Sequence, residues 1–563
     1  MIKKEDIKYF SYPNPQFRRE NYTLLDGECD FLIYSNEDNS LFKKTKILIP
    51  YAYETPKSGV NDETMYEHVA YYMDFNIDKL SNYILHFQAV DYECDVYINS
   101  HFVGNHVGGY TNFNFDVSKY LVLGKNTLVV DVKDSFSKEQ LRGKQREVKE
   151  SHECWYVQTT GIYKSLYLEE CGTNHIEKAY FSGDKNGKID YKIIATSADD
   201  LTVNISYQGK LVKSFTLSGS LKYEGSLTLD EYTLWKENEG NIYDVELVLD
   251  GEKEDRVSTY FGFRTIEAKG TDIYINDEKV FLRLVLNQGY YENQGVTLNK
   301  DNILEDFNLM RDFGFNGCRI HQKVEDPLLY YLADYYGFYL WSELPSCYEY
   351  SDRMKSEIDR DLFLIIDQYY NCPSIITYVI FNESWGIPKI RYDVETQEYV
   401  ISVKDKVKSY DPTRLAIAND GWHNLSNTDI LSLHEYQQSA EEFSKTYANK
   451  DLVINENIIN CYGKAFAENQ SYNGQPIIIT EFGGIAISQQ EGWGYGDKAN
   501  DLSILKERMQ KLFDAIYKLD YICGFCYTQL SDVYQETNGL VYENRKSKLP
   551  PEEVKKIVYR GDL

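Results

Sequence analysis

The feature that most constrains the fold of this chain is a change of pattern after the segment Gly262-Phe263-Arg264. From there on, apolar runs of strand length alternate with amphipathic stretches of helical period, which predicts βα units around a parallel sheet. Helices are predicted between the runs, among others over residues 302–313 and 327–336. Eight such units predict a (β/α)8, or TIM, barrel over residues 266–563. The eight apolar runs are residues 280–286, 317–321, 338–344, 375–383, 414–419, 430–436, 476–481 and 522–529.

Two β-rich regions precede the barrel. Residues 1–172 contain short alternating segments separated by Gly, Asn and Asp, and this pattern predicts an antiparallel β-sandwich. Residues 173–265 contain further segments of the same kind and have the size of an immunoglobulin-like β-sandwich. A chain of 563 residues also exceeds what one hydrophobic core usually organises. We therefore expect a multidomain protein with domains at 1–172, 173–265 and 266–563.

Composition narrows the classes of partner. A formal net charge of −28, without a long Lys/Arg tract, argues against nucleic acid and against anionic membranes. No apolar segment follows Lys3 and Lys4, and no apolar run is long enough to span a membrane, so the sequence predicts a cytoplasmic protein. The 10 scattered cysteines suggest no disulfide framework. The expected partner is a small-molecule or oligosaccharide substrate, and the sequence leaves open whether copies of the chain form a homo-oligomer.

Two glutamates stand at the ends of predicted barrel strands. Glu383 follows the apolar run 375–381, and Glu481 follows the run 477–480. An ionisable side chain directly after a buried strand costs desolvation energy, so it needs either a partner or a function. One such glutamate alone could be a structural ion pair, but two on strands half a barrel apart, converging on one mouth, favour catalysis. Hydrolysis of a glycoside with retention of configuration needs such a pair of carboxylates.

Several short motifs, in order along the chain, resemble glycoside hydrolase family 2, the family of β-galactosidases, β-glucuronidases and β-mannosidases. They include residues 25–31, 108–113 and 160–163 in the first β-rich region, 262–264 at the junction, and 381–386 after the fourth barrel strand. The resemblance extends over essentially the whole chain. It implies that the first sandwich is a jelly-roll, sugar-binding-like domain and that the protein is a glycosidase.

The resemblance also implies roles for residues of the barrel. Glu383 would be the acid/base and Glu481 the nucleophile. Asn382 would bind the 2-hydroxyl of the sugar, a contact that strengthens in the transition state. Tyr436 resembles a tyrosine whose hydroxyl holds the nucleophile, which would keep that carboxylate ionised. Arg319 resembles the arginine that the family places beside the nucleophile.

Further residues are expected at the same mouth. His321 and His434 point toward it by register, either as sugar contacts or as hydrogen-bonded structural imidazoles. Trp385 and Trp493 are candidates for stacking on sugar, with packing as the alternative. Asn287 lies in a segment that differs from that of large β-galactosidases and resembles an Asn-Gln-Gly-Tyr sequence of a less characterised bacterial branch.

Departures from the family pattern bear on metal and substrate. Residues 341–348 lack the Glu-x-His with which metal-using β-galactosidases hold magnesium, so no essential metal and no cofactor are expected. Residues 532–541 lack the lysine of glucuronide-cleaving relatives, and Asp532 and Glu536 there could accept hydrogen bonds from neutral hydroxyl groups. The sequence therefore predicts a retaining exo-β-glycosidase for terminal neutral β-hexosides, with β-galactosides expected. A β-glucuronidase, β-mannosidase or β-glucosidase, and a non-catalytic carbohydrate-binding protein, are the alternatives.

Overall fold

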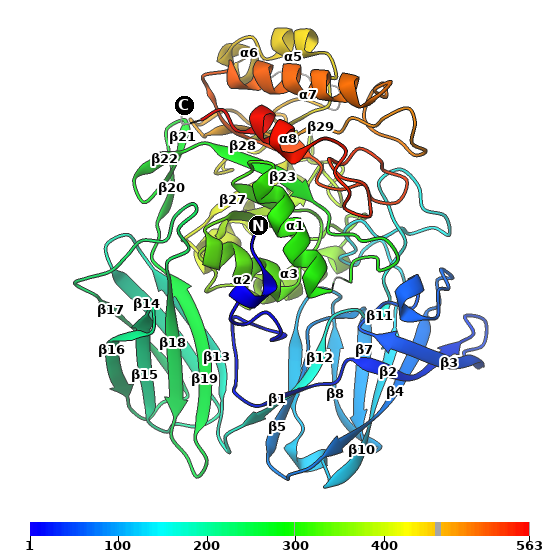
Figure 1. Ribbon diagram of the computed structural model, residues 1–563, viewed down its shortest axis with the longest axis vertical. Coiled ribbons are helices and arrows are strands. Elements are labelled where there is room, and N and C mark those ends of the chain that lie inside the picture. The colour runs from blue at the N-terminus through cyan, green and yellow to red at the C-terminus, as the bar shows by residue number, and fades with distance from the viewer. Residues whose placement is uncertain (298, 456–462, 562–563) are drawn as a thin grey trace.

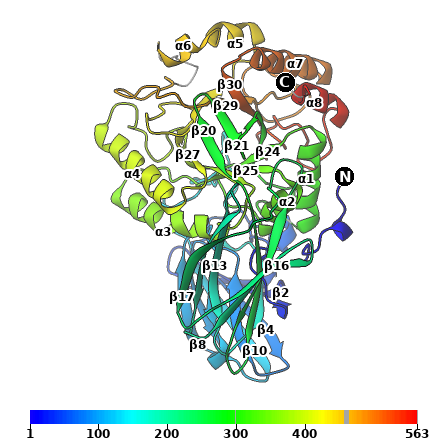
Figure 2. The same ribbon diagram turned by 90° about the vertical axis from the view of Figure 1, so that its left-hand side faces the viewer.

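The computed structural model describes residues 1–297, 299–455 and 463–561. Two β-sandwiches lie side by side below a barrel of parallel strands (Figure 1). Turned by 90°, both sandwiches again lie below the barrel, whose helices surround its strands (Figure 2). The multidomain architecture expected from the sequence is therefore confirmed. Both sandwiches precede the barrel in the sequence.

The first sandwich consists of antiparallel sheets around one apolar core. Cys29, Phe31 and Ile33 alternate with more exposed neighbours along one strand, because side chains of a strand point to opposite faces in turn. The larger sheet has the order β3-β2-β4-β10-β7-β8, the smaller one β1-β12-β5-β9, and β6 pairs with β11. The strands are β1 (Tyr22–Leu24), β2 (Gly27–Tyr34), β3 (Leu41–Ile49), β4 (His68–Ile77), β5 (Asn82–Phe87), β6 (Val90–Asp91), β7 (Glu93–Ile98), β8 (His101–Val107), β9 (Phe113–Asp116), β10 (Gly124–Lys133), β11 (Gly161–Ile162) and β12 (Leu166–Cys171).

The second sandwich packs a three-stranded sheet, β13-β14-β17, against a four-stranded sheet, β16-β15-β18-β19. Val203, Ile205, Val245 and Leu247 are among the buried residues between them. Seven strands in two antiparallel sheets agree with the predicted immunoglobulin-like sandwich. The strands are β13 (Ile176–Gly183), β14 (Lys188–Ala195), β15 (Leu201–Tyr207), β16 (Lys210–Leu217), β17 (Lys222–Thr228), β18 (Ile242–Leu249) and β19 (Asp255–Gly262).

The barrel follows a three-stranded antiparallel meander formed by β20 (Ile266–Lys269), β21 (Asp272–Ile275) and β22 (Glu278–Val280). Its parallel strands have the order β27-β26-β25-β24-β23-β30-β29-β28, and β27 also lies next to β28, so the barrel is nearly closed. All eight predicted strands are confirmed, each to within two residues. They are β23 (Leu282–Asn287), β24 (Gly317–Ile320), β25 (Tyr339–Glu343), β26 (Ile375–Asn382), β27 (Leu415–Asp420), β28 (Leu431–Glu435), β29 (Ile477–Gly483) and β30 (Ile522–Thr528).

Helices join most of these strands. The clearest boundary signals belong to α2, which begins at Pro327 after the capping side chain of Asp326 and ends before Gly337 with φ 65°. One predicted feature is missing, because residues 421–430, all of them described, join β27 to β28 without a helix. The helices are α1 (Lys300–Asp312), α2 (Pro327–Tyr336), α3 (Asp352–Gln368), α4 (Val394–Tyr410), α5 (Ala440–Thr446), α6 (Lys450–Ile454), α7 (Leu502–Tyr517) and α8 (Pro551–Val558), with 3-10 turns at Lys4–Asp6, Pro56–Ser58 and Ser118–Tyr120.

The segment between β10 and β11 of the first sandwich reaches up to the barrel, where it is drawn in cyan (Figure 1). The backbone N–H groups of Arg142 and Gly143 both donate to the carbonyl of Ser346, at 3.0 Å each. The Tyr348 hydroxyl donates in return to the carbonyl of Gly143 at 2.7 Å. These bonds hold the segment, residues 134–160, against the barrel loop after β25. Within the described part of the chain, no helix is long and apolar enough to cross a membrane.

Candidate active site

Glu383 stands where β26 ends and the chain turns sharply. Glu383 and Ser384 have φ of 50° and 63°, in the left-handed region that non-glycine residues rarely adopt. Each such residue costs about 1–3 kcal/mol and persists only where its surroundings fix it. Here the N–H of Glu383 donates to the carbonyl of Asp420 at 2.9 Å, and that of Ser384 to Asn419 Oδ1 at 3.0 Å. The turn directs the Glu383 carboxylate into the barrel mouth.

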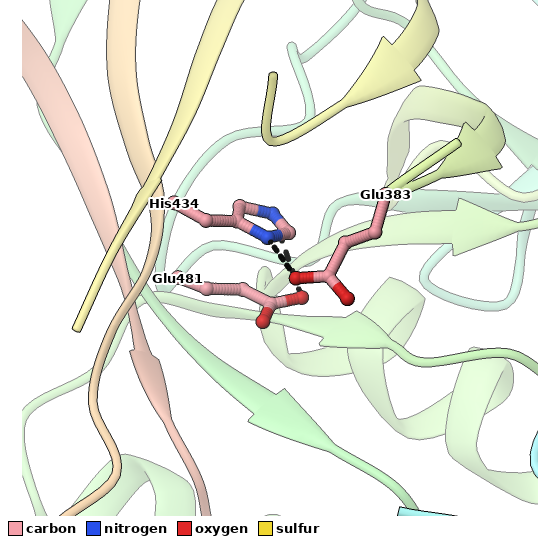
Figure 3. A group of neighbouring side chains, drawn as sticks. All are labelled: Glu383, His434 and Glu481. Carbon is pink, nitrogen blue, oxygen red and sulfur yellow. Dashed lines mark hydrogen bonds and ion pairs between the residues drawn. The ribbon is translucent and has the colours of Figure 1, made fainter. Parts of the chain in front are cut away.

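Glu481 lies within β29 and is surrounded by donors. The Tyr436 hydroxyl donates to its Oε2, and Arg319 Nη1 donates to its Oε1 at 3.1 Å. One oxygen each of Glu383 and Glu481 and one ring nitrogen of His434 all lie within 4.8 Å of one another. Both carboxylates point toward the same imidazole (Figure 3). The structure therefore brings together the two glutamates that the sequence singled out.

His434 bridges the carboxylates. Its Nδ1 lies 2.8 Å from Glu383 Oε1, and its Nε2 lies 3.1 Å from Asp420 Oδ2 and 3.5 Å from Glu481 Oε1. Burial by itself would lower the pKa of His434, but Glu481 and Asp420 outweigh burial and raise this pKa to about 10. We therefore interpret this group of side chains as an ion-pair network.

The loop after β27 makes room for this imidazole. Gly421 has φ 101°, and a Cβ atom there would lie only 2.7 Å from His434 Nδ1. A residue without a side chain is thus required both by the backbone conformation and by the close approach of the ring.

Arg319 on β24 is fully buried and fixes several oxygens at once. Its guanidinium contacts Glu343 Oε2 at 2.8 Å, Asp420 Oδ2 at 2.5 Å and Glu481 Oε1 at 3.1 Å. It also donates to Asn382 Oδ1 at 2.6 Å. Asn382 Nδ2 is buried and has no hydrogen-bond partner among the described residues. The Asn382 amide is thus oriented with one donor group left to serve a ligand.

Two further predicted residues, His321 and Asn287, make different contacts. His321 Nδ1 lies 3.0 Å from Glu343 Oε2, and burial, with Lys144 and Arg319, lowers the pKa of His321 far below its ordinary value, so the ring is neutral. Asn287 accepts a hydrogen bond from the N–H of Gly289 at 3.0 Å and so shapes its own loop. Neither residue forms a hydrogen bond or ion pair with the two glutamates, although both lie at strand ends facing the mouth.

The two predicted tryptophans are engaged in packing. Trp385 stacks on Trp155 with ring centres 5.0 Å apart, and Lys144 Nζ lies 4.7 Å from the Trp385 ring centre. Trp493 packs edge-on against Tyr495 and donates from its indole N–H to the carbonyl of Glu153 at 2.8 Å. These contacts favour the packing alternative for both rings and place them at the border between barrel and first sandwich.

The wall opposite the barrel loops comes from residues 134–160 of the first sandwich. The Tyr156 hydroxyl donates to Glu536 Oε2, and Asn538 Nδ2 donates to Glu536 Oε1 at 3.1 Å. Burial raises the pKa of Glu536, an effect that Lys144 opposes. Sequence reasoning did not include Lys144, Trp155 or Tyr156 in the site, because no local pattern reveals which sandwich loop reaches the barrel.

Family models match most of the described domains. The sugar-binding domain of glycosyl hydrolases family 2 matches residues 37–171, a second family 2 model matches 169–264, and the family 2 TIM barrel domain matches 266–356. The chain belongs to glycoside hydrolase family 2.

Curated relatives of the chain are named for two activities. A putative β-glucuronidase of Formosa agariphila is 25% identical over 402 residues, which cover 66% of this chain and 48% of the relative. A β-galactosidase of Clostridium acetobutylicum is 23% identical over 523 residues, which cover 85% of this chain and 53% of the relative. The chain thus spans about half the length of these curated relatives.

Solved family 2 structures share the fold over the full chain. The structure of a β-D-glucuronidase from Dictyoglomus thermophilum matches with a TM-score of 0.79 at 19% identity, covering 97% of this chain and 98% of that chain. At this identity, the likeness shows a shared arrangement of the two sandwiches and the barrel. It does not identify the substrate, which has to be inferred from the residues of the site.

Two acidic residues of the network were not predicted, although a signal for them exists. Asp420 and Glu343 are the last residues of β27 and β25, and in TIM barrels the carboxyl ends of strands carry the site. The Arg319 and His434 charges outweigh burial and hold the pKa of Asp420 below its ordinary range. An acidic residue at the carboxyl end of a predicted barrel strand would have been a sufficient reason to include both.

Proposed function

We propose that this protein is a retaining exo-β-glycosidase in which Glu481 is the nucleophile and Glu383 the general acid/base. The observation that carries this proposal is the approach of the Glu383 and Glu481 oxygens to within 4.8 Å. Retaining enzymes separate their two carboxyl groups by about 5–5.5 Å, whereas inverting enzymes leave about 6.5–9.5 Å for a water molecule. The short separation therefore supports double displacement through a glycosyl-enzyme intermediate.

The environments of the two carboxylates support this division of roles. The Glu481 side chain is 4% exposed and receives hydrogen bonds from Tyr436 and Arg319, which hold it as an oriented anion below the sugar. The Glu383 side chain is 16% exposed and lies nearer the open mouth. A general acid/base has to reach first the leaving oxygen and then an incoming water, and both enter from that side.

The reaction proceeds in two steps. Glu481 attacks the anomeric carbon while Glu383 gives its proton to the leaving oxygen, and a covalent glycosyl ester forms. Glu383 then takes a proton from water, which attacks the same carbon and releases Glu481. The free N–H of Asn382 is suited to a sugar hydroxyl, and its orientation by Arg319 would make this contact available without reorganisation.

Two classes of glycone remain as candidates. The β-galactosidase and putative β-glucuronidase relatives suggest a neutral hexose and a hexuronic acid, respectively. The expectation of a neutral hexoside rested on residues 532–541. Asp532, however, is paired with Lys548 at 2.7 Å and accepts from the N–H of Gly539 at 2.8 Å, so its charge is neutralised and its Oδ1 is occupied. The acids of that stretch therefore give weaker support to a neutral sugar than their sequence suggested.

Substitution of the two glutamates tests the assignment. Glu481→Gln is expected to abolish turnover of every aryl β-glycoside, because no covalent intermediate can form. Glu383→Gln is expected to slow substrates with poor leaving groups far more than dinitrophenyl glycosides, which need no protonation, and added azide should restore part of the rate. Glu491→Gln, at an exposed position, is the control. Equal behaviour of both active-site variants across leaving groups would contradict the proposed roles.

A further inference from the structure

Lys144 is a buried cation of the first sandwich that lies beside Trp385 at the barrel mouth. Its side chain belongs to the 134–160 segment, and the residue is only 7% exposed. The backbone holds it in place, since the Lys144 carbonyl accepts from the N–H of Tyr156 at 2.8 Å and the preceding Gly143 is bonded to Ser346 of the barrel. Its ammonium lies 4.7 Å from the ring centre of Trp385, two residues after Glu383.

Lys144 is charged in this environment. Burial by itself would lower the pKa of Lys144, but Cys154 and the carboxylates of Glu536, Glu383 and Glu481 outweigh burial and raise this pKa above its ordinary value. The side chain nevertheless forms no ion pair with any Asp or Glu of the described residues. A buried ammonium without a carboxylate in contact is costly, and binding sites are where such a cost is found.

The other cations near the mouth are already paired. Arg319 is in contact with three carboxylates, and His434 with the same network. Lys323 lies 3.0 Å from Glu325 Oε2 and donates to the carbonyl of Gly289 at 3.0 Å. Of these four cations, Lys144 is the one that no carboxylate of the described residues contacts.

We propose that Lys144 pairs with a carboxylate group on the sugar, so that the preferred substrates are β-linked hexuronides. This inference rests on the proposed glycosidase function and selects the acidic class of glycone over the neutral one. The lysine that the sequence lacks in the barrel segment 532–541 would then be supplied from another domain. Lys144 acts as a specificity-determining residue: it takes no part in either displacement.

A purely electrostatic role of Lys144 would affect the activity on different substrates in a different way. If the ammonium only offset the field of the three carboxylates around it, its loss would weaken catalysis on all glycosides alike, because Glu383 and Glu481 are common to every substrate. If it binds a sugar carboxylate, its loss affects only substrates that carry one. Leaving that carboxylate unpaired in a buried pocket costs several kcal/mol, whereas a neutral hydroxymethyl group loses no ion pair.

The test compares matched aryl β-glucuronide, β-galacturonide, β-glucoside and β-galactoside on wild type, Lys144→Met, Lys144→Arg and the control Lys149→Met. Lys149 lies in the same segment but is exposed. We expect wild type to prefer at least one uronide, and Lys144→Met to lower kcat/KM on it about 100-fold while changing neutral substrates less than about threefold. Lys144→Arg should retain part of the uronide activity, and Lys149→Met should behave as wild type.

A binding measurement separates this inference from the proposed reaction. Calorimetric titration with free glucuronate and galacturonate should give binding to wild type that is lost in Lys144→Met, whereas glucose and galactose should not distinguish the two proteins. A wild type that prefers neutral glycosides, or a parallel loss on all substrates in Lys144→Met, would overturn the role of Lys144. Absence of hydrolysis with every glycoside would refute the proposed reaction, and the titration would still decide whether Lys144 binds a uronate.

Discussion

His434 offers a quantitative test of the ion-pair network. Its imidazole lies against the carboxylates of Glu383, Asp420 and Glu481, with Arg319 on the far side of the last two. The folded-state pKa of His434 is about 10, against about 6.5 for an unfolded histidine. A raised folded pKa means that the stabilisation is fully present below the unfolded value and is lost as pH rises through the folded value.

The size of the effect follows from this difference. About 3.5 pH units correspond to at most about 5 kcal/mol of stability, all of it lost between about pH 6.5 and pH 10. His434→Gln keeps a polar side chain of similar reach but cannot carry the charge. We therefore expect wild type to be more stable than the variant near pH 6.5, and the difference to shrink steadily as pH approaches 10.

Calorimetric unfolding of both proteins at steps between pH 6.5 and 10 measures this difference. Other groups titrate in the same range, since burial with Asp134 raises the pKa of Asp91 to about 8 and burial lowers that of Lys164 to about 8. These groups are present in both proteins, so they cancel in the difference. His101→Gln, at an exposed position, is the control. A constant gap between wild type and His434→Gln over the whole range would refute the protonated bridge.

Two further outcomes follow from the proposed reaction. Proton NMR of early hydrolysis should show the β-anomer of the released sugar first, because two inversions amount to retention, and the α-anomer appearing first would indicate an inverting enzyme. Tyr436→Phe keeps the ring stacked on Tyr495 at a 3.4 Å centroid distance but removes the hydrogen bond to Glu481. A hydrogen bond to a charged group is worth about 1.5–3 kcal/mol, so kcat/KM should fall about 10- to 100-fold, and an unchanged kcat/KM would show that this bond does not serve catalysis.

The barrel was predictable because its strands are buried on both sides. A continuous apolar run such as residues 375–381 is typical of a strand buried on both faces, and its alternation with helical stretches identifies the barrel. The end of the run locates the end of the strand where site residues of such barrels lie. The fifth connection was mispredicted as a βα unit, because residues 421–430 form turns at Gly421 and around His423 rather than a helix. A barrel tolerates the loss of one outer helix, and the pattern of the strands alone does not reveal which helix is missing.

The limits of prediction lay at contacts between segments that are not adjacent in the sequence. Asp532 was expected to bind sugar because it is an acid near strand eight. Lys548, sixteen residues later, neutralises its charge. Lys144 is one of many lysines in loops, and the bonds of its segment to Ser346 and Tyr348 bring it to the mouth. Both outcomes depend on which distant residue comes into contact, and periodicity of the sequence carries no information about that.

If the proposed function holds, the anchoring of residues 134–160 on the barrel has a consequence for how substrate preference can diverge. The strand ends that hold Glu383 and Glu481 belong to the barrel core, and the segment adds Leu141 to that core and packs Tyr156 against Tyr290 and Val533 of the barrel. Substitutions at positions of the segment that lie outside these clusters, such as Lys144, can therefore alter what the mouth accepts while the segment stays anchored. Divergence of substrate preference in such a chain would accumulate in the sandwich, while the barrel keeps the chemistry constant.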